Sequence, residues 1–280
     1  MNKLYNYKLP LKNGTYRDGI IVETATGYGD IAPLPGFSRE TLADARDEAI
    51  RLLPDFPNCI PTLPSVRFAF DCAQVPLTSV KVPVNALNEY RNEFVALKIK
   101  VGHLSVEQAV LLSKKVPKNC ALRLDFNRQW SLEKLLQFSS HFSPDDFEYL
   151  EEPTAQFSDL LLFSRKTGFP IAVDESIPYV PYWEIPTLKA LVIKPTILGT
   201  IPKPPPGVEL IFSSAFESGI GVLHIARLAE KMNPNRPHGL DPYTHLLEDL
   251  LTPKPKIENG LFEWTGSPII KHGSLCLLAK

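Results

Sequence analysis

The feature that most constrains the fold of this chain is a series of short apolar runs, each of which ends on ionisable residues. The runs cover residues 94–101, 120–125, 147–152, 170–174 and 189–194. Each interval between them leaves room for one helix and two loops, and parallel strands need a connection of about a dozen or more residues. The series therefore predicts parallel strands joined by right-handed helical crossovers.

A sheet of this kind either closes into a barrel or stays open as a doubly wound sheet. In a barrel the carboxyl ends of all strands meet at one mouth, whereas an open sheet collects ligands mainly at one switch point. Ionisable side chains stand at the carboxyl ends of five successive predicted strands. Since they can meet only in the closed form, we predict an α/β barrel.

The first part of the chain has a different pattern. Residues 20–24 alternate as a strand, residues 27–36 form a loop rich in glycine and proline, and a helix is expected from Ser38 to about Leu53. We predict a small α+β domain over residues 1–80, with residues 255–280 packing back onto it. The barrel is expected to occupy residues 81–254.

Composition narrows the classes of partner. The chain has 280 residues with 44% hydrophobic residues, and a formal net charge of −1 gives no general attraction to nucleic acid or to anionic membranes. No apolar stretch approaches the length of a membrane-spanning helix, and the first residues lack the apolar core of a secretory signal. The four scattered cysteines are typical of a reducing compartment. We expect a cytoplasmic protein with a small-molecule partner, and the sequence predicts no oligomeric state.

Three carboxylates at the predicted strand ends indicate a metal site. Asp125, Glu151 and Asp174 supply hard oxygen ligands of the kind that Mg²⁺ prefers, and no histidine cluster competes for a softer metal. Glu152 and Glu175 directly follow two of these residues. Because neighbouring strand residues point to opposite sides, we expect these two to support the ligands rather than to bind the metal.

Two lysines share one face of the first run, because side chains of a strand repeat every two residues. Lys98 and Lys100 would therefore face one interior, where burial and their mutual repulsion would lower their pKa values and let one act as a base. Lys194 ends another apolar run. With a metal nearby, these residues predict a reaction that begins with proton abstraction next to a carboxylate. The ordinary alternative for such a lysine pair is an exposed edge strand.

Several motifs together resemble the enolase superfamily, and within it the o-succinylbenzoate synthase family. The motifs around the strand ends are Lys98-Ile-Lys100-Val-Gly, Arg123-Leu-Asp125-Phe-Asn127, Leu150-Glu151-Glu-Pro, Ala172-Val-Asp174-Glu-Ser and Val192-Ile-Lys194-Pro. The narrower resemblance rests on residues 27–38, 213–218 and 239–241. It implies a modified (β/α)7β TIM-type barrel with an α+β capping domain. It also implies a hydro-lyase of menaquinone biosynthesis. This enzyme forms o-succinylbenzoate by syn-elimination of water from 2-succinyl-6-hydroxy-2,4-cyclohexadiene-1-carboxylate, via an enediolate intermediate.

The resemblance also implies a role for each matching residue. Asp125, Glu151 and Asp174 match the Mg²⁺ ligands of the family, where Mn²⁺ can replace the metal. Lys100 matches the base, Lys98 its electrostatic partner, and Lys194 a lysine that stabilises the intermediate by a cation–π contact. The remaining matches are residues that bind substrate or orient the first ligand, namely Ser213, Ser214, Gly239, Arg123 and Asn127. Phe126 and Phe216 are larger than the side chains expected at their positions.

Two other functions stay open at this point. An N-succinylamino acid racemase or related epimerase of the same superfamily would use the same lysines for a 1,1-proton transfer. Epimerases of dipeptides typically carry an Asp-x-Asp pair near the last barrel strand, whereas the corresponding stretch here has one aspartate, Asp241. A non-catalytic barrel that only binds ligands is the more remote alternative, because all the expected carboxylates and lysines are present.

Overall fold

The structure is a computed structural model that describes residues 2–266 and 269–280. The chain forms two compact units. The first contains the residues up to Pro83, Ile193–Pro202 and the stretch from Phe212 to the C-terminal end; the second contains Val84–Val192 and Lys203–Ile211. The bounds of these units differ from those of the predicted domains, which are residues 1–80 with 255–280 and residues 81–254. The predicted division stays a prediction.

An antiparallel sheet of four strands organises the N-terminal part of the first unit. Its order is β16-β1-β2-β3, and the strands cover Leu275–Ala279, Lys3–Pro10, Tyr16–Glu23 and Tyr28–Ile31. Buried apolar residues of β1, β2 and β3 pack with two helices into one apolar core. That core includes Leu4, Ile20, Val22, Ile31, Ala45, Ala49, Val66, Ala69 and Phe70.

The two helices of this core are α1 (Leu42–Leu52) and α2 (Pro64–Cys72). The helix expected from Ser38 begins later, because Thr41 caps it: the Thr41 side chain accepts from the N–H of Asp44 while Asp44 bonds back to the cap. Helix α2 was missed in the sequence. Its signal is Pro64 at the first helical turn, where a proline costs no hydrogen bond.

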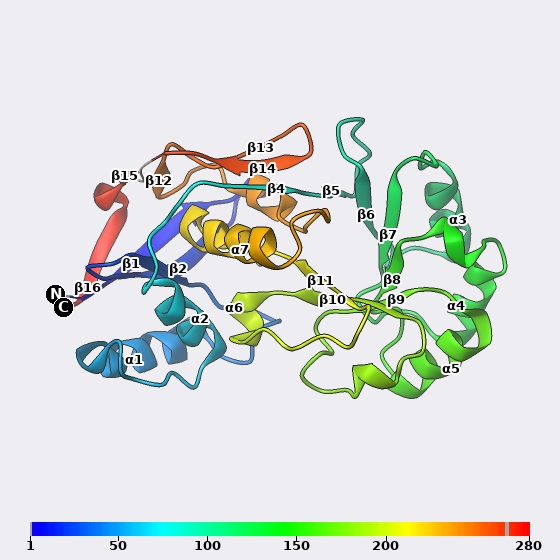
Figure 1. The fold of residues 1–280 in the computed structure, drawn as a ribbon, viewed down its shortest axis with the longest axis horizontal. Coiled ribbons are helices and arrows are strands. Elements are labelled where there is room, and N and C mark those ends of the chain that lie inside the picture. Colours follow the sequence, from blue (N-terminus) through cyan, green and yellow to red (C-terminus); the bar gives the residue numbers. More distant parts are fainter. Residues whose placement is uncertain (1, 267–268) are drawn as a thin grey trace. The chain divides into compact units, whose positions relative to one another are not determined.

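The second unit is built on a curled sheet with the order β11-β10-β9-β8-β7-β6-β5. From β5 to β10 neighbouring strands pair in parallel, as the apolar runs predict. The strands are β5 (Ala86–Leu87), β6 (Ala96–Lys100), β7 (Ala121–Asp125), β8 (Tyr149–Glu151), β9 (Ile171–Val173), β10 (Leu188–Ile193) and β11 (Glu209–Phe212). Figure 1 shows the three crossover helices of this unit beside one another along the sheet: α3 (Val106–Lys114), α4 (Leu132–Ser139) and α5 (Phe157–Thr167).

The rest of the first unit follows the last two strands of the curled sheet. Helix α6 (Pro195–Leu198) comes directly after β10, and α7 (Gly219–Met232) comes after β11. An eighth strand is reduced to a single bridge, in which Gly239 pairs in parallel with Ser213 while the N–H of the neighbouring His238 donates to the carbonyl of Pro83. These bonds join the segment after β11 to the segment before β5. The fold is thus a TIM-type α/β barrel with a capping domain.

Short antiparallel strands complete the first unit. Strands β13 (Lys256–Glu258) and β14 (Leu261–Trp264) extend β4 (Val80–Pro83), and β12 (Leu251–Thr252) pairs with β15 (Ile269–Ile270). Among the residues that the structure describes, no helix is long and apolar enough to cross a membrane.

Candidate active site

The register of the curled sheet brings the predicted ionisable residues to one edge. Lys100 pairs across from Asp125, and Asp125 pairs across from Glu151, so these three residues stand level at the ends of β6, β7 and β8. Asp174 directly follows the last residue of β9. The carboxyl ends of four neighbouring strands therefore carry the four residues, as the sequence predicts.

Lys98 lies two residues deeper on the same face and is buried among carboxylates. Its Nζ lies 2.8 Å from Oε1 and 3.2 Å from Oε2 of Glu151, and 3.3 Å from Oδ2 of Asp125. Both carboxylates are buried as well. One buried ammonium thus binds two buried carboxylates, an arrangement in which each charge offsets the cost of burying the other.

The electrostatic state of Lys98 differs from the one that the sequence predicts. Burial alone would lower its pKa, but the negative charges of Glu151, Asp125 and Asp174 outweigh burial, and they raise the pKa of Lys98 well above its ordinary value. The expectation that Lys98 and Lys100 lower each other's pKa is therefore wrong for Lys98. Lys100 has an exposed side chain, and its backbone N–H donates to the Asn88 side chain over 2.9 Å.

Three backbone N–H groups donate to the carboxylates of Asp125 and Glu152 at this edge. Oδ1 of Asp125 accepts from the N–H of Asn127 over 3.1 Å, so Asn127 acts through its backbone, and its φ of 46° is left-handed. Oε1 of the buried Glu152 accepts from the N–H groups of Asp174 and Ser176 over 2.8 and 2.9 Å. Burial raises the pKa of Glu152 despite these donors. Glu175 is partly buried beside them.

Arg123 lies below this edge, level with Lys98, and its side chain is fully buried. Its Nε donates to Glu148 over 2.5 Å and its Nη1 to Asn85 over 3.0 Å, while the guanidinium carbon lies 5.0 Å from the centre of the Tyr149 ring. These contacts connect β7 with the start of β8 and the segment before β5. The predicted contact of Arg123 with substrate stays a prediction.

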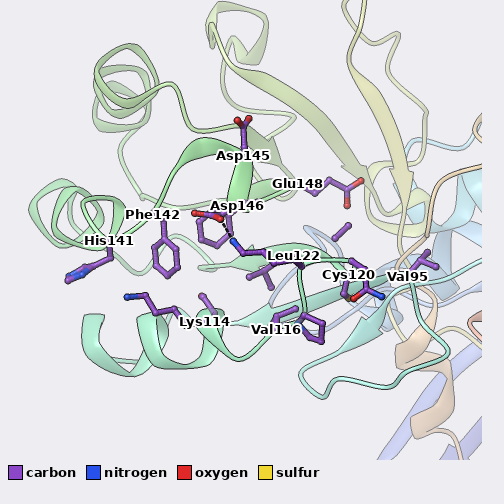
Figure 2. A pocket seen from close by; sticks show the side chains of 16 residues that line it. Val95, Lys114, Val116, Cys120, Leu122, His141, Phe142, Asp145, Asp146 and Glu148 are labelled. Atoms are coloured by element: carbon purple, nitrogen blue, oxygen red, sulfur yellow. Dashed lines mark hydrogen bonds and ion pairs between the residues drawn. The ribbon is translucent and has the colours of Figure 1, made fainter.

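The opposite, amino-terminal ends of β6, β7 and β8 border a hollow of about 560 Å³, which is drawn in Figure 2. It is lined by Val95, Cys120, Leu122, the end of α3 and the residues that follow α4. Two acidic residues there already have cationic partners, since Asp146 binds Lys118 over 2.5 Å and Glu148 binds Arg123. The edge with Lys98 differs, because there several carboxylates face one cation.

The remaining predicted residues belong to the first unit. Lys194 precedes α6, is partly buried, and holds its Nζ 5.9 Å from the centre of the Phe37 ring. Ser213 donates from its Oγ to the carbonyl of Gly239 over 3.2 Å, and the Ser214 N–H donates to that same carbonyl over 3.0 Å. The Ser214 Oγ is buried and has no hydrogen-bond partner among the described residues.

Two residues of this unit were missed in the sequence. Phe37 is half exposed although it is a large aromatic residue, and it lies in the loop whose sequence matches the family. Arg17 is buried in β2 although its side chain is charged. The sequence signal for Phe37 is its place in the motif of residues 27–38. No sequence signal marks Arg17.

The fold and the comparisons with known proteins define the class of this chain. Residues 1–77 match the family "MenC, N-terminal domain", and residues 83–183 match the family "Enolase C-terminal domain-like". A curled parallel sheet with ionisable residues at its carboxyl ends, joined to a capping domain, is thus an enolase-type barrel.

Individual proteins narrow this class. The o-succinylbenzoate synthase of Pasteurella multocida (strain Pm70) is 31% identical, over 90% of this chain and 92% of that protein. The solved o-succinylbenzoate synthase of Thermosynechococcus elongatus BP-1, complexed with magnesium in its active site, is 24% identical with a TM-score of 0.66, over 89% of this chain and 94% of that chain. The solved dipeptide epimerase of Enterococcus faecalis V583 shares the fold, with 19% identity and a TM-score of 0.75 over 95% and 97%. The chain belongs to the o-succinylbenzoate synthase family of the enolase superfamily.

Proposed function

We propose that this chain is an Mg²⁺-dependent o-succinylbenzoate synthase of menaquinone biosynthesis. The reaction is the syn-elimination of water from 2-succinyl-6-hydroxy-2,4-cyclohexadiene-1-carboxylate. The identity with the Pasteurella multocida synthase along nearly the whole of both chains supports this activity. The structural observation that carries the proposal is the buried cluster in which the Lys98 ammonium binds Glu151 and Asp125 at the carboxyl ends of neighbouring strands.

The proposed metal ligands are Asp125, Glu151 and Asp174. Among residues 2–266 and 269–280, no three His, Cys, Asp or Glu side chains converge closely enough to hold a metal ion as they stand. The donor set nevertheless fits, because Asp125 and Glu151 already share one cation, the Lys98 ammonium, and all three side chains offer the carboxylate oxygens that Mg²⁺ prefers. When bound, Mg²⁺ or the similar Mn²⁺ supplies positive charge beside the substrate carboxylate.

Lys100 is the proposed base. Its amine takes the proton from the carbon next to the carboxylate, and the electrons of that C–H bond pass to the carboxylate to give an enediolate. These electrons then form the new double bond as the C–OH bond breaks. The resulting ammonium returns its proton to the departing hydroxyl, so that water leaves and the amine is regenerated. Lys100 suits this role because its side chain is exposed, whereas Lys98 is buried in ion pairs and suits the role of a fixed positive charge.

The other predicted residues complete this proposal. Lys194 would stabilise the negative charge of the intermediate through the face of the substrate ring, and Ser213, Ser214 and the backbone of Gly239 would bind substrate carboxylate groups. The buried Ser214 Oγ, which has no hydrogen-bond partner among the described residues, supports such a role. Arg123 is proposed to contact substrate, and Asn127, Glu152 and Glu175 to hold the metal ligands in place.

Nothing in the structure favours the alternatives. The likeness to dipeptide epimerases is one of fold, at 19% identity. A barrel without catalysis would have no use for a buried lysine among carboxylates, whose burial costs free energy. The proposal includes a small-molecule substrate, no nucleic-acid or membrane partner, and a cytoplasmic location, with which four free thiols are compatible.

An assay with the cyclohexadiene substrate tests the proposed function. Purified protein with Mg²⁺ is expected to form o-succinylbenzoate, followed by the change in ultraviolet absorbance as the ring becomes aromatic. Lys100→Ala should abolish turnover while folding and metal binding persist, and Lys114→Ala, an exposed lysine of α3, should leave turnover unchanged. Folded, metal-loaded protein without turnover would show that the activity is a different one.

A further inference from the structure

Arg17 is a buried cation that donates to the carbonyl of the neighbouring Asp18 over 3.4 Å and otherwise to backbone carbonyls of two distant loops. Its Nη1 donates to Pro33 over 2.8 Å and its Nη2 to Ala32, while its Nε donates to Phe216 over 3.1 Å and its Nη2 also reaches Ala215 over 3.4 Å. A guanidinium has five donors in a rigid fork, and a buried charge is costly unless it is hydrogen-bonded. Arg17 therefore holds residues 32–33 and residues 215–216 at one fixed distance.

The first of these loops continues into a tight turn that carries Phe37. The N–H groups of Phe37 and Ser38 both donate to the carbonyl of Leu34, over 3.0 and 2.8 Å, and the N–H of Leu34 donates to Oγ of Ser38 over 2.9 Å. Gly36 gives this turn its left-handed residue, with a φ of 82°. Once residues 32–33 are fixed, the position of the Phe37 backbone is fixed too.

The second loop is tied to the segment that carries Lys194. The fully buried Glu217 accepts from the N–H of Ala215 over 2.6 Å and from Oγ1 of Thr196 over 2.7 Å. Thr196 stands two residues after Lys194, in the first turn of α6. The same loop begins with Ser213 and Ser214, so one set of buried bonds fixes both the serines and the lysine segment.

The two loops meet again where Lys194 lies 5.9 Å from the centre of the Phe37 ring, within cation–π distance. These contacts thus connect Arg17 through both loops to Phe37 and Lys194, and together they form the Arg17 network. We propose that Arg17 is a positioning residue of the synthase reaction, which holds Phe37 against Lys194 and keeps the loop of Ser213 and Ser214 in register with them. This inference rests on the function proposed above for Lys194 and the two serines.

The test compares Arg17→Met with the wild type in the Mg²⁺-loaded full-length protein. Misplacing reacting groups by about an ångström can cost on the order of 100-fold in rate, so kcat should fall about 10- to 100-fold. KM should change by less than about threefold, since the lost positioning matters most in the transition state. The ammonium of Arg17→Lys cannot span both loops, so the kcat of this variant should lie between those of the wild type and Arg17→Met. Arg17→Lys takes the place of Arg17→Met in the test if Arg17→Met does not fold.

A matched control separates positioning from plain stability. Glu48 is also buried and accepts from two backbone N–H groups of a loop, those of Thr62 and Leu63. These contacts include no residue of the Arg17 network. Glu48→Gln should lower the unfolding free energy yet leave kcat unchanged. An Arg17 variant that folds and keeps the kcat of the wild type would overturn the proposal.

Hydrogen exchange tests whether Arg17 holds the two loops in place, and it needs no catalytic turnover. In Arg17→Met the amides of residues 34–38 and 213–217 should exchange faster, while those of β1 and β2 keep their protection. Unchanged exchange in both loops would overturn the proposal. A wild type without synthase activity would instead refute the proposed function, and the exchange result would still decide whether Arg17 fixes the loops.

Discussion

The Nζ of Lys98 lies 2.8 Å from Oε1 of Glu151, and both side chains are buried. Removing one partner of a buried ion pair leaves an uncompensated charge, which costs about 3–5 kcal/mol. Lys98→Met should therefore lower the free energy of unfolding by roughly this amount in metal-free protein. Because Mg²⁺ would then compensate the buried carboxylates in place of Lys98, its addition should stabilise Lys98→Met more than the wild type.

Urea unfolding with and without Mg²⁺ measures both effects. Lys114→Met, which removes a lysine from the surface of α3, is the control and should respond to Mg²⁺ as the wild type does. A Lys98→Met protein that is as stable as the wild type in EDTA would contradict the assignment of Lys98 as the compensating cation.

Glu152 is expected to set the metal affinity without binding the metal. Its Oε1 holds the N–H groups of Asp174 and Ser176, so Glu152→Ala should free the loop that carries Asp174. Loss of such a support typically weakens metal binding by about 10- to 100-fold. Glu152→Gln keeps an acceptor oxygen and should lose less. Calorimetric titration with Mg²⁺ measures the affinity, with Asp145→Ala, an exposed carboxylate at the opposite strand ends, as the control; equal affinities for all variants would refute this role.

The strand ends could be predicted from sequence because two regular signals coincide there. The period of two residues fixes which side chains share a face, and the spacing of the runs fixes parallel order, so the alignment of Lys100, Asp125 and Glu151 follows from pattern alone. How deeply each of these side chains is buried does not follow from the sequence pattern. Lys98 and Lys100 share a face, yet one is buried in ion pairs and the other is exposed, because the carboxylates that surround Lys98 come from other strands.

Contacts between distant segments account for what the sequence does not predict. Arg17 is buried in β2 although its side chain is charged, and its partners at Ala215 and Phe216 lie far along the chain. The pKa of Lys98 depends in the same way on carboxylates supplied by three later segments. Local propensity contains none of this information, whereas a family motif contains part of it, which is why Phe37 could have been found and Arg17 could not.

Phe126 follows the proposed ligand Asp125 but belongs to the core. Its ring is fully buried and meets the rings of Trp130 and Phe138 edge to face, with centroids 4.8 and 6.2 Å away. Its size therefore fills the layer between sheet and helices. Phe126→Ala should lower the unfolding free energy by about 3–5 kcal/mol, measured by urea denaturation. Folded Phe126→Leu should keep the Mg²⁺ affinity of the wild type, and a large loss of affinity would place the ring in the site.

Two buried groups of the first unit should give opposite pH dependences of stability. Burial lowers the pKa of His224 from 6.5 to about 4, and its Nε2 donates to the carbonyl of Tyr28. Burial raises the pKa of Asp30 from 3.8 to about 6, although Tyr7 and Ser218 donate to the carboxylate. Each shift corresponds to roughly 3 kcal/mol of folding free energy.

The signs follow from which state binds the proton more tightly. Unfolded protein binds the His224 proton more tightly, so this stability is complete above pH 6.5 and is lost as the pH falls toward 4. Folded protein binds the Asp30 proton more tightly, so this stability is complete below pH 3.8 and is lost as the pH rises through 6. In the wild type the two slopes partly cancel between pH 4 and 6.

Variants of one residue should reveal how each group alone changes the unfolding free energy with pH. His224→Gln leaves the Asp30 contribution, so its unfolding free energy should fall relative to that of the wild type as the pH rises from 4 to 6.5. Asp30→Asn leaves the His224 contribution, so its unfolding free energy should rise relative to the wild type over the same range. Urea titrations across this range measure both slopes, and an exposed variant such as Asp145→Asn should follow the wild type. Since the two variants must diverge in opposite directions, parallel pH profiles for both would show that neither group titrates in the folded protein as its burial implies.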